Sequence, residues 1–575
     1  MTDLLNHTPL PRRWKVQHPI PRDIDVALGD FSPLMRQLLY NRGLSDPVSA
    51  AAFIAGEVAY ATDPFLLKDM VAAVDRLHTA ILREETIVVY GDYDADGVTG
   101  SALMYEFLTA LGTAPRIYIP NRFDEGYGLN EEAIRQLAAE GADLVITVDC
   151  GARSVREVSL AVELGMDVII TDHHAPGEVL PPSAALINPK QPGDAYPFRY
   201  LAGVGLAYKL TQAYLETYPQ DEVNPADWLD LVAIGTVADL ASLQGENRML
   251  VREGLMRLRR GSRPGLVALA GAAGLNLADC NTGMIGFGLG PRLNAAGRID
   301  TAMTAFELLT TRDYHRAGEL AQKLDDQNSQ RQEETQQIRE MAAARVLERD
   351  PDALLFFAAD PQFNSGVVGL AASRLSEAYY RPAIIAHQGE EFTVGSCRSI
   401  EEFHITKALD ECEHLLVRHG GHAAAAGFTV RNELVPELVQ QLTTIAERDL
   451  AGVELTPVID IDRDIRLEKL NGKLISGIFT DLHRLEPTGR GNPEPVFASY
   501  DLSVRHARPV GKENAHLKLT LQAGSTLYDA IAFQQGHWFT EMPERVDIAY
   551  RFEVNNYMGR VNLQLNVKDL RPAGK

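Results

Sequence analysis

The sequence predicts an α/β protein: two successive α/β domains joined by a long helix, with an all-β module at the C-terminal end. β-branched apolar segments alternate with segments of helical spacing from residue 86 to residue 171, and an alternation of the same kind starts again near residue 352. Residues 453–575 show mainly the period-two pattern of strands. A chain of 575 residues also exceeds what one hydrophobic core supports, so several domains are expected.

The first α/β domain is predicted over residues 61–311, after an N-terminal helical segment over residues 1–60. Its strands are predicted at Thr86–Tyr90, Ile117–Ile119, Leu144–Val148 and Val168–Thr171. Its helices are predicted at Thr99–Leu111, Asn130–Ala139 and Val155–Leu164. This order predicts a mostly parallel sheet that is covered by helices on both faces.

The remaining parts follow from composition and periodicity. Residues 312–350 lack Pro and are rich in Gln, Glu, Arg and Ala, which predicts a long connecting helix that is polar all round. Residues 351–452 are the second α/β domain, which opens with the strand Leu354–Ala358. Residues 453–575, with strands such as His516–Gln522 and Val561–Val567, are predicted to form an OB-fold-like module.

Charge and cysteine content exclude some classes of protein. A net charge of −23 argues against a protein that coats nucleic acid indiscriminately, although a narrow basic channel is compatible with it. The four cysteines form no C-x-x-C pair, so neither a disulfide framework nor a thiolate zinc site is indicated. The sequence has no long apolar stretch and no leader pattern, so we expect a cytoplasmic protein without membrane contact.

Three alternating aspartates follow the first predicted strand. The run Asp92-Tyr93-Asp94-Ala95-Asp96-Gly97 crowds carboxylates that repel one another unless a cation lies between them. It matches the start of an EF-hand calcium loop, but Leu103 stands where that loop has Glu, and a strand rather than a helix precedes the run. A polar turn between a strand and a helix is the alternative to a divalent metal site.

Further polar side chains follow later apolar segments of this domain. Asp149 follows one predicted strand, Asp172-His173-His174 follows the next, and Asp239 follows Leu231–Val237, which is expected to be another strand. The carboxyl ends of parallel strands border the ligand crevice of an α/β sheet. We therefore expect the following side chains to lie close together in the fold: Asp94, Asp96, Asp149, His173 and Asp239. Taken singly, each could instead be a helix cap or a loop residue.

The donor set indicates the metal and the chemistry. Carboxylates with one or two imidazoles suit Mn²⁺ or Mg²⁺ better than zinc, and a cluster of this size can hold two ions with one carboxylate bridging. Two ions roughly 3.5–4 Å apart orient an attacking hydroxide and neutralise charge on a phosphoryl group. The residues thus predict phosphodiester hydrolysis by in-line displacement.

The order of these motifs resembles a known family. Asp94-Ala95-Asp96-Gly97, Asp149, Asp172-His173-His174 and Asp239 resemble the successive motifs of the DHH phosphoesterase superfamily. Within it, the chain is similar to the RecJ family of bacterial exonucleases, which degrade single-stranded DNA from the 5′ end. Further segments make the resemblance specific to this family within the superfamily. They are Asn121-Arg122, Glu125–Gly128, Gly290–Arg298, Ser396–Ser399, Gly420–His422 and Pro487–Pro495.

The resemblance implies roles for these residues. Asp94 and Asp149 would hold one ion, while Asp96, Asp149, His173 and Asp239 would hold the other, with Asp149 bridging. His174, which with Asp149 is a predicted catalytic residue, would point at the scissile phosphate. Arg122, Ser396 and Arg398 match positions that bind a terminal 5′ phosphate. Further predicted DNA contacts in the matching motifs are Arg292, Asn294, Arg298, Ser399 and His422; for Arg292 and Arg298 a surface salt bridge is the alternative.

Two positions depart from the family pattern. Many relatives have a metal-binding His where this chain has Tyr90, so Asp92 or water would complete the first metal shell. Asn364 replaces another His, and it can donate a hydrogen bond without carrying charge.

The C-terminal module carries a run of basic residues and several aromatic residues that could stack on bases. The basic residues are Arg505, His506, Arg508, Lys512, His516 and Lys518, and the aromatic residues are Phe533, Trp538 and Tyr557.

The function expected from the resemblance is a single-stranded-DNA-specific exonuclease of recombination and repair. It would release 5′-mononucleotides with two Mn²⁺ or Mg²⁺ ions, act as a monomer, and work with a single-strand-binding protein and a helicase. The alternatives are a superfamily enzyme for a small substrate such as a cyclic dinucleotide, and a catalytically silent DHH scaffold that binds other proteins. The C-terminal module argues against the first alternative and the complete set of carboxylates against the second.

Overall fold

The computed structural model describes residues 10–56, 62–122, 125–557 and 560–574, and the side chains of residues 555–561 lie outside the described part. The chain divides into two compact units. One unit comprises Ala51–Glu333 and Glu486–Pro493, and the other comprises Met1–Ala50, Glu334–Leu485 and Glu494–Lys575. Each unit has hydrophobic clusters of its own, as the large buried cluster of the first unit and the smaller clusters of the second show.

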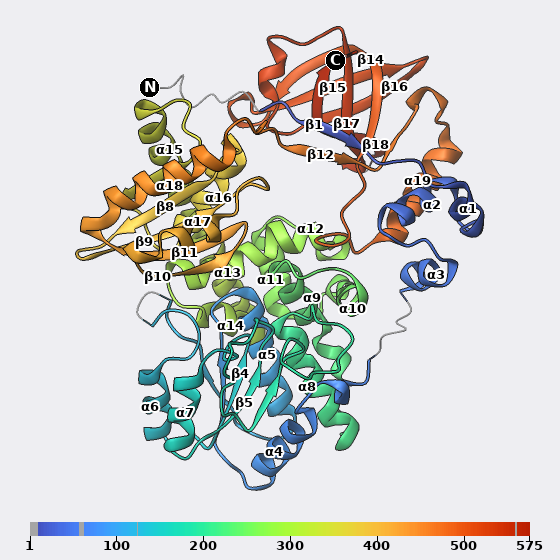
Figure 1. The fold of residues 1–575 in the computed structure, drawn as a ribbon. Coiled ribbons are helices and arrows are strands. Elements are labelled where there is room, and N and C mark those ends of the chain that lie inside the picture. Colours follow the sequence, from blue (N-terminus) through green and yellow to red (C-terminus); the bar gives the residue numbers. More distant parts are fainter. Residues whose placement is uncertain (1–9, 57–61, 123–124, 558–559, 575) are drawn as a thin grey trace. The chain divides into compact units, whose positions relative to one another are not determined.

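The first unit is built on a parallel five-stranded sheet of order β3-β2-β4-β5-β6 (Figure 1). Its strands are β2 (Ile87–Gly91), β3 (Arg116–Tyr118), β4 (Leu144–Val148), β5 (Asp167–Thr171) and β6 (Ala185–Ile187). The chain passes from β2 to β3 on one side and then to β4 on the other. The switch point of the sheet therefore lies between β2 and β4, and such points bind ligands in open α/β sheets.

Helices cover both faces of this sheet because successive side chains of its buried strands point to opposite sides. Ile87 and Val89 of β2 belong to the core with α4, α5, α8 and α9, while Val88 and Tyr90 belong to the core with α6 and α7. The bounds of these helices are Met70–Leu82 (α4), Ala95–Ala110 (α5), Glu131–Ala139 (α6), Val155–Glu163 (α7), Gly203–Thr217 (α8) and Leu229–Ala238 (α9). Those of the later helices are Gly245–Arg260 (α10), Pro264–Ala272 (α11), Thr282–Met284 (α12), Gly290–Ile299 (α13) and Met303–Thr310 (α14).

One predicted strand of this unit is a helix. Leu231–Val237, expected to be a strand, lies inside α9, and every residue from Leu229 to Val237 is buried. A segment that is apolar on all sides shows neither helical nor strand periodicity, so the sequence pattern could not separate the two structures. Asp239 nevertheless follows the end of the segment as expected, because it is the C-cap residue of α9.

The long connecting helix is α15 (Tyr314–Arg349), but the prediction that it is polar all round was wrong. Ala317, Leu320, Ala321 and Leu324 are buried in the first unit. Ile338, Ala342, Ala343 and Val346 are buried in a core of the second unit. These residues recur at helical spacing within each half, so each half of α15 buries an apolar stripe of its own.

The second unit contains a mixed five-stranded sheet of order β10-β11-β9-β8-β7, in which only β7 and β8 are parallel. Its strands are β7 (Phe356–Asp360), β8 (Ala383–Gln388), β9 (Phe392–Arg398), β10 (Leu416–His422) and β11 (Ala425–Arg431). The accompanying helices are α16 (Val368–Tyr379), α17 (Ile405–Glu411) and α18 (Val435–Leu450). This part is α/β, as predicted.

The C-terminal part is a five-stranded closed barrel, as the predicted OB-fold requires. The strands are β14 (Phe497–Val510), β15 (His516–Ala523), β16 (Thr526–Ala532), β17 (Arg545–Tyr557) and β18 (Arg560–Pro572), and pairing of β14 with β17 closes the barrel. The short strand β13 (Arg463–Asp464) pairs with β14. The amphipathic helix α19 (Gly472–Leu485) was not predicted from the sequence.

The N-terminal segment is not wholly helical. Its helices are α1 (Arg22–Ala27), α2 (Pro33–Asn41) and α3 (Pro47–Ala55), but the strand β1 (Arg13–Val16) precedes them. This strand pairs in parallel with β12 (Val458–Ile461), a partner that lies far away in the sequence. Among the described residues, none of the helices combines the length and the apolar character needed to cross a bilayer.

Candidate metal centre

The three aspartates after β2 occupy different environments. Asp94 is the N-cap of α5, and its Oδ1 accepts hydrogen bonds from the backbone N–H groups of Asp96 (2.9 Å) and Gly97 (3.2 Å). Asp96 is buried in the first turn of the same helix. The predicted DNA contact Asn294 has a structural bond here, because its Oδ1 accepts a hydrogen bond of 2.8 Å from the Ala95 N–H.

The N-terminus of α8 holds the carboxylate of Asp96. The N–H of Gly203 donates to one carboxylate oxygen at 2.7 Å, and the N–H of Val204 donates to the other at 2.9 Å. A side chain at position 203 would collide with Asp149, whose Cβ would lie 2.6 Å from the added carbon. Glycine at this position therefore brings Asp96 and Asp149 to the same helix end.

Asp149 and His173 lie at the ends of β4 and β5. Asp149 is 2% exposed and has a left-handed backbone with φ of 64°, a strained conformation for a residue other than glycine. Its Oδ1 lies 3.1 Å from Nε2 of His173, and the same nitrogen lies 3.9 Å from Oδ2 of Asp239. The side chains of Asp149, His173 and Asp239, which follow two strands and a helix, thus meet.

Three buried atoms of this cluster have no hydrogen-bond partner among the described residues: Oδ1 of Asp92, Oδ1 of Asp149 and Nε2 of His173. Orphaned buried atoms of this kind are costly unless a cation satisfies them. Donor atoms lie within 4.8 Å of one another in three groups: Asp92, Asp94 and Asp149; Asp96, His173 and Asp239; and Asp149, His173 and His174. The donor set and its unsatisfied atoms fit two adjacent divalent cations.

The pKa values of the cluster residues also indicate that a cation would stabilise the cluster. Burial raises the pKa of Asp92, Asp96 and Asp149 well above the ordinary value, and repulsion between the carboxylates raises it further. Burial, together with Asp94, raises the pKa of Asp239 to about 7. Burial lowers the pKa of His173 to about 3, which keeps the imidazole neutral and able to bind a metal.

Tyr90 does not take the place of the family histidine. Its side chain is fully buried in the core with α6 and α7, where its hydroxyl donates to the carbonyl of Gly128 at 3.1 Å and its ring stacks on Tyr118. Asp92, by contrast, is grouped with Asp94 and Asp149. Asp92, and not Tyr90, therefore lies among the grouped donor atoms.

His174 is held from two sides. Its Nδ1 lies 2.8 Å from Oδ1 of Asp172 and 3.1 Å from the hydroxyl of Tyr127. The proton of that hydroxyl is donated to the backbone carbonyl of Asp149 at 3.1 Å. Burial alone would lower the pKa of His174, but the hydrogen bond and the charge of Asp172 raise it. Tyr127 was not predicted as a site residue, although its motif Glu125–Gly128 was noticed in the sequence.

Cationic side chains lie beside the cluster. The guanidinium of Arg122 lies 5.0 Å from the centre of the Tyr93 ring. Burial, together with the charges of Arg122 and Arg331, lowers the pKa of Arg298 to about 10. Lys190, which was not predicted, donates through Nζ to the backbone carbonyl of His173.

Arg292, another predicted DNA contact, binds protein groups of the same unit. It forms an ion pair of 2.7 Å with Asp325 and donates to the carbonyl of Gly288 at 2.9 Å. Arg292 is therefore paired with a carboxylate in this structure.

The predicted phosphate residues of the second unit gather at the start of α16. Arg398 donates to Oγ of Ser396 at 3.1 Å, and a carbon added to Gly369 in the first turn of α16 would lie 2.9 Å from that oxygen. Ser399 is engaged in its own loop, where its hydroxyl donates to the carbonyl of Phe403 at 2.7 Å. His422 is exposed at the end of β10.

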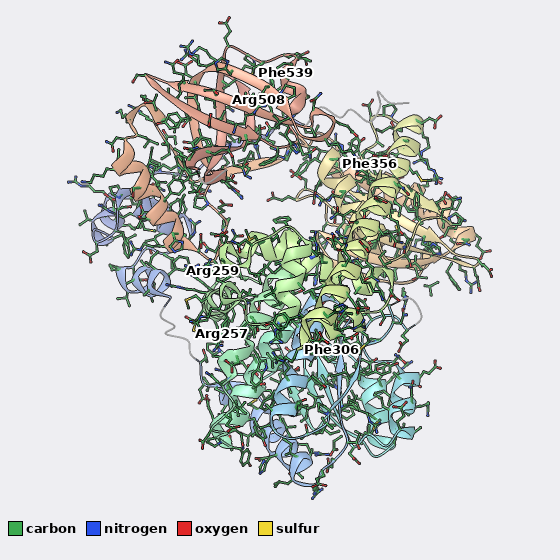
Figure 2. The ribbon with its side chains drawn as sticks, turned by 180° about the vertical axis from the view of Figure 1, so that it is seen from behind. Arg257, Arg259, Phe306, Phe356, Arg508 and Phe539 are labelled. Atoms are coloured by element: carbon green, nitrogen blue, oxygen red, sulfur yellow. The ribbon has the colours of Figure 1, made fainter. Side chains whose placement is uncertain are left out.

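The barrel carries part of its basic run on paired strands. Arg508 of β14 lies opposite Lys518 of β15, and His516 packs edge-on against the half-exposed ring of Phe533. Arg508 and Phe539 are both carried by the barrel in Figure 2. Tyr557, predicted as a stacking residue, lies outside the residues whose side chains are described.

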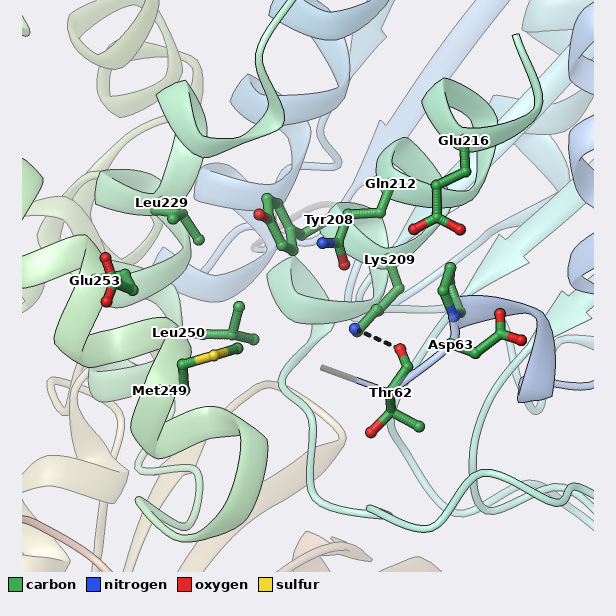
Figure 3. A pocket seen from close by; sticks show the side chains of 11 residues that line it. Thr62, Asp63, Tyr208, Lys209, Gln212, Glu216, Leu229, Met249, Leu250 and Glu253 are labelled. Atoms are coloured by element: carbon green, nitrogen blue, oxygen red, sulfur yellow. Dashed lines mark hydrogen bonds between the residues drawn. The ribbon is translucent and has the colours of Figure 1, made fainter. Parts of the chain in front are cut away.

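A separate pocket of about 240 Å³ in the first unit contains none of the predicted site residues (Figure 3). Among its lining side chains, Lys209 donates to the carbonyl of Thr62 at 3.2 Å and forms a fully buried ion pair with Glu246.

Comparison with known proteins identifies three parts of the chain. The DHH family N-terminal domain matches residues 86–236, the DHHA1 domain matches residues 351–448, and the RecJ OB domain matches residues 461–569. Among solved structures, RecJ from Thermus thermophilus in complex with Mn²⁺ has a TM-score of 0.83 and 31% identity, covering 98% of this chain and 80% of that chain. The same protein in complex with Mg²⁺ has a TM-score of 0.77 and 30% identity, covering 98% and 79%.

Curated relatives are similar over nearly the whole chain. The single-stranded-DNA-specific exonuclease RecJ of Bacillus subtilis (strain 168) is 40% identical over 97% of this chain and 70% of that protein. The protein of the same name from Escherichia coli (strain K12) is 34% identical over 96% of this chain and 98% of that protein. Identity at this level, over almost the whole of this chain, places it in the RecJ family of DHH proteins.

Proposed function

We propose that this protein is a single-stranded-DNA-specific exonuclease that hydrolyses phosphodiester bonds from the 5′ end and releases 5′-mononucleotides. The observation that carries the proposal is the cluster of buried carboxylates and imidazoles at the switch point of the first sheet, with three unsatisfied donor atoms among the described residues. Relatives named for this activity support it. The OB domain supports single-stranded DNA as the substrate.

The proposed ligand sets follow the grouping of the donor atoms. Asp92, Asp94 and Asp149 would hold one ion, and Asp96, His173 and Asp239 would hold the other, with Asp149 close enough to His173 to be shared. When bound, Mn²⁺ or Mg²⁺ ions would activate the attacking water and neutralise the charge that develops on the phosphate. The similar structures of RecJ from Thermus thermophilus in complex with Mn²⁺ and with Mg²⁺ support this choice.

His174 is proposed to contact the scissile phosphate. Asp172 accepts a hydrogen bond from Nδ1 and raises the pKa of His174. In the protonated ring Nε2 would also carry a proton, which it could donate to a phosphate oxygen. Tyr127 restrains the same ring from a second side. In this proposal the ring acts beside the cluster as a hydrogen-bond donor and not as a metal ligand.

Phosphate contacts are proposed for each unit separately. In the first unit, the charge of Arg122 disfavours the charged state of Arg298, and a bound phosphate would reverse this effect. In the second unit, Ser396 and Arg398 would bind a phosphate at the first turn of α16. His422 and the basic residues of the barrel remain predicted DNA contacts, as do Arg292 and Ser399.

The protein partners rest on family resemblance. We propose a single-strand-binding protein and a helicase that supplies single strands, a monomeric state and a cytoplasmic location. Mass measurement of the purified chain, alone and with each partner, would test the first three statements.

The decisive experiment uses single-stranded DNA labelled at either end, with Mn²⁺ or Mg²⁺. We expect labelled mononucleotide at once from the 5′ label and only late from the 3′ label. Asp149→Asn should abolish release, whereas Asp167→Asn, on the exposed start of β5, should not. Early release from the 3′ label, or cleavage of a cyclic dinucleotide in preference to the DNA, would contradict the proposal.

A further inference from the structure

A segment of the C-terminal region contributes to the unit that holds the metal cluster. Residues Glu486–Pro493 lie in sequence between α19 and the barrel strand β14, yet they belong to the same compact unit as Ala51–Glu333. The segment is the orange loop beside α12 in Figure 1. Nothing in the activity proposed above requires this segment, so its contacts need an explanation.

The segment binds the loop that begins at Asp239. The N–H of Leu243 donates to the carbonyl of Arg490 at 2.7 Å. The side-chain amide of Gln244 donates to the carbonyl of Gly491 at 2.8 Å. Arg490 in turn reaches the carbonyl of Leu240, the residue after Asp239, at 3.4 Å. These hydrogen bonds tie the segment to residues 240–244.

The other side of the segment is anchored to helices of the same unit. Arg248 of α10, which is buried, donates to the carbonyl of Pro487 at 3.0 Å. The hydroxyl of Thr282 in α12 donates to the carbonyl of Thr488 at 2.6 Å. Arg259 of α10, labelled in Figure 2, lies 3.8 Å from Glu486. The segment is thus fixed independently of the loop that it contacts.

The fit between the segment and the loop is close. Gly491 has a left-handed φ of 78°, and a carbon added to it would lie 2.3 Å from Oγ of Ser242 and 3.3 Å from the side chain of Gln244. At Gly489, an added carbon would lie 2.7 Å from the side chain of Leu243. Only glycine permits this approach without displacement of the loop.

Asp239 is the member of the cluster that most needs such support. Asp92 and Asp149 directly follow β2 and β4, and Asp94 and Asp96 lie at the start of α5. Asp239 instead follows the end of a helix and precedes Leu240, whose φ is also left-handed at 58°. Positions of metal ligands commonly depend on such supporting contacts.

We propose that Glu486–Pro493 is a positioning segment for Asp239, so that the chain leading into the barrel completes the metal centre of the DHH domain. The segment does not touch the reacting atoms in this role. It holds the loop 240–244, and the loop holds the carboxylate in place for the ion that Asp96 and His173 share with it.

The test compares full-length variants by isothermal titration with Mn²⁺ and by steady-state kinetics. Gly491→Val should weaken binding of one of the two ions at least tenfold, leave KM for single-stranded DNA within twofold, and lower kcat in a way that excess Mn²⁺ restores. Gly452→Ala is the control for adding a side chain at a left-handed glycine, because Gly452 has a similar φ of 73° but open space around it. Gln244→Ala removes one hydrogen bond only and should give a smaller change in the same direction, even where Gly491→Val fails to fold.

The outcomes separate this proposal from the proposed function, on which it rests for the role of Asp239. If Asp239→Ala leaves Mn²⁺ binding unchanged, the ligand assignment is wrong. If Asp239→Ala weakens binding but Gly491→Val and Gln244→Ala bind Mn²⁺ like Gly452→Ala, the positioning role is wrong. A change in KM for DNA without a change in Mn²⁺ affinity would also overturn it, because the segment would then act on the substrate.

Discussion

Asp172 and Asp149 are both buried aspartates at the carboxyl ends of neighbouring strands, yet their carboxylates differ in what they bind. Oδ1 of Asp172 accepts hydrogen bonds from His174, and Oδ2 accepts one of 2.8 Å from the N–H of Ala152. Burial would raise the pKa of Asp172, but these bonds lower it. Asp149 keeps an oxygen without a partner among the described residues. The first carboxylate is therefore suited to orient a histidine and the second to bind a metal.

This difference leads to a prediction for Asp172→Asn. The amide cannot stabilise the protonated ring, so the pKa of His174 should fall and the alkaline limb of the pH–kcat profile should move to lower pH. We expect kcat to fall roughly 10- to 100-fold, while the affinity for Mn²⁺ stays close to that of the parent. The measurement is a pH–rate series with Mn²⁺ titration, and Asp167→Asn on the same strand is the control. Loss of Mn²⁺ binding would show that His174 is a ligand instead.

At the scale of elements, helix ends supply most of the polar contacts of the sites. The N-terminus of α5 holds Asp94, that of α8 holds Asp96, and α9 ends at Asp239. In the second unit, the first turn of α16 lies against Ser396 and Arg398 of β9. Backbone N–H groups at helix N-termini favour anions, whether these are carboxylates of the protein or phosphates of a substrate.

The arrangement at α16 predicts that Arg398→Ala weakens selection of the 5′ end. Loss of a hydrogen bond to a charged group costs about 1.5–3 kcal/mol, which corresponds to roughly a 10- to 100-fold loss of preference for a 5′ phosphate over a 5′ hydroxyl. The measurement is kcat/KM on the two substrates. Arg431→Ala, which removes an exposed arginine of β11 that is paired with Glu391, is the control. An unchanged preference in Arg398→Ala would remove this residue from the 5′-phosphate site.

At the scale of the whole molecule, the metal cluster concentrates like charge inside a unit that must stay folded without the ions. The carboxyl pKa values are raised in the folded protein above the unfolded value of about 4. Between about pH 4 and the pKa of about 7 for Asp239, the folded metal-free protein therefore holds protons that the unfolded chain has lost. Its free energy of unfolding should fall as pH rises through this window.

Binding of Mn²⁺ should restore the free energy of unfolding that is lost as pH rises, because the ions take the place of the protons. We expect the rise in Tm on adding Mn²⁺ to be larger at about pH 8 than at about pH 5.5. At about 100 times Kd, one bound ion contributes about 2.7 kcal/mol. Calorimetry of the full chain at the two pH values measures the effect. The Asp149→Asn variant should show a smaller rise and a higher metal-free Tm at the alkaline pH; an equal rise at both pH values would contradict the prediction.

The comparison of predicted and observed elements shows where sequence reasoning works. Strands β2, β4 and β5 and the cap at Asn130 were predicted closely, because local propensity and burial agree there. The strand β1 was missed because its partner β12 lies far away in the sequence. The helix α9 was taken for a strand because it is buried on all sides, which hides its period.

The sequence by itself determined which carboxylates and imidazoles end the elements of the first sheet, since that follows from the covalent order of apolar segments and polar residues. It also determined the family, because the motifs stand in a fixed order. Only the tertiary structure decided that Asp92 and not Tyr90 faces the cluster, that Asp325 engages Arg292, and that Glu486–Pro493 supports the loop after Asp239. Each of these depends on side-chain direction or on contacts between distant segments, which packing sets and local pattern does not.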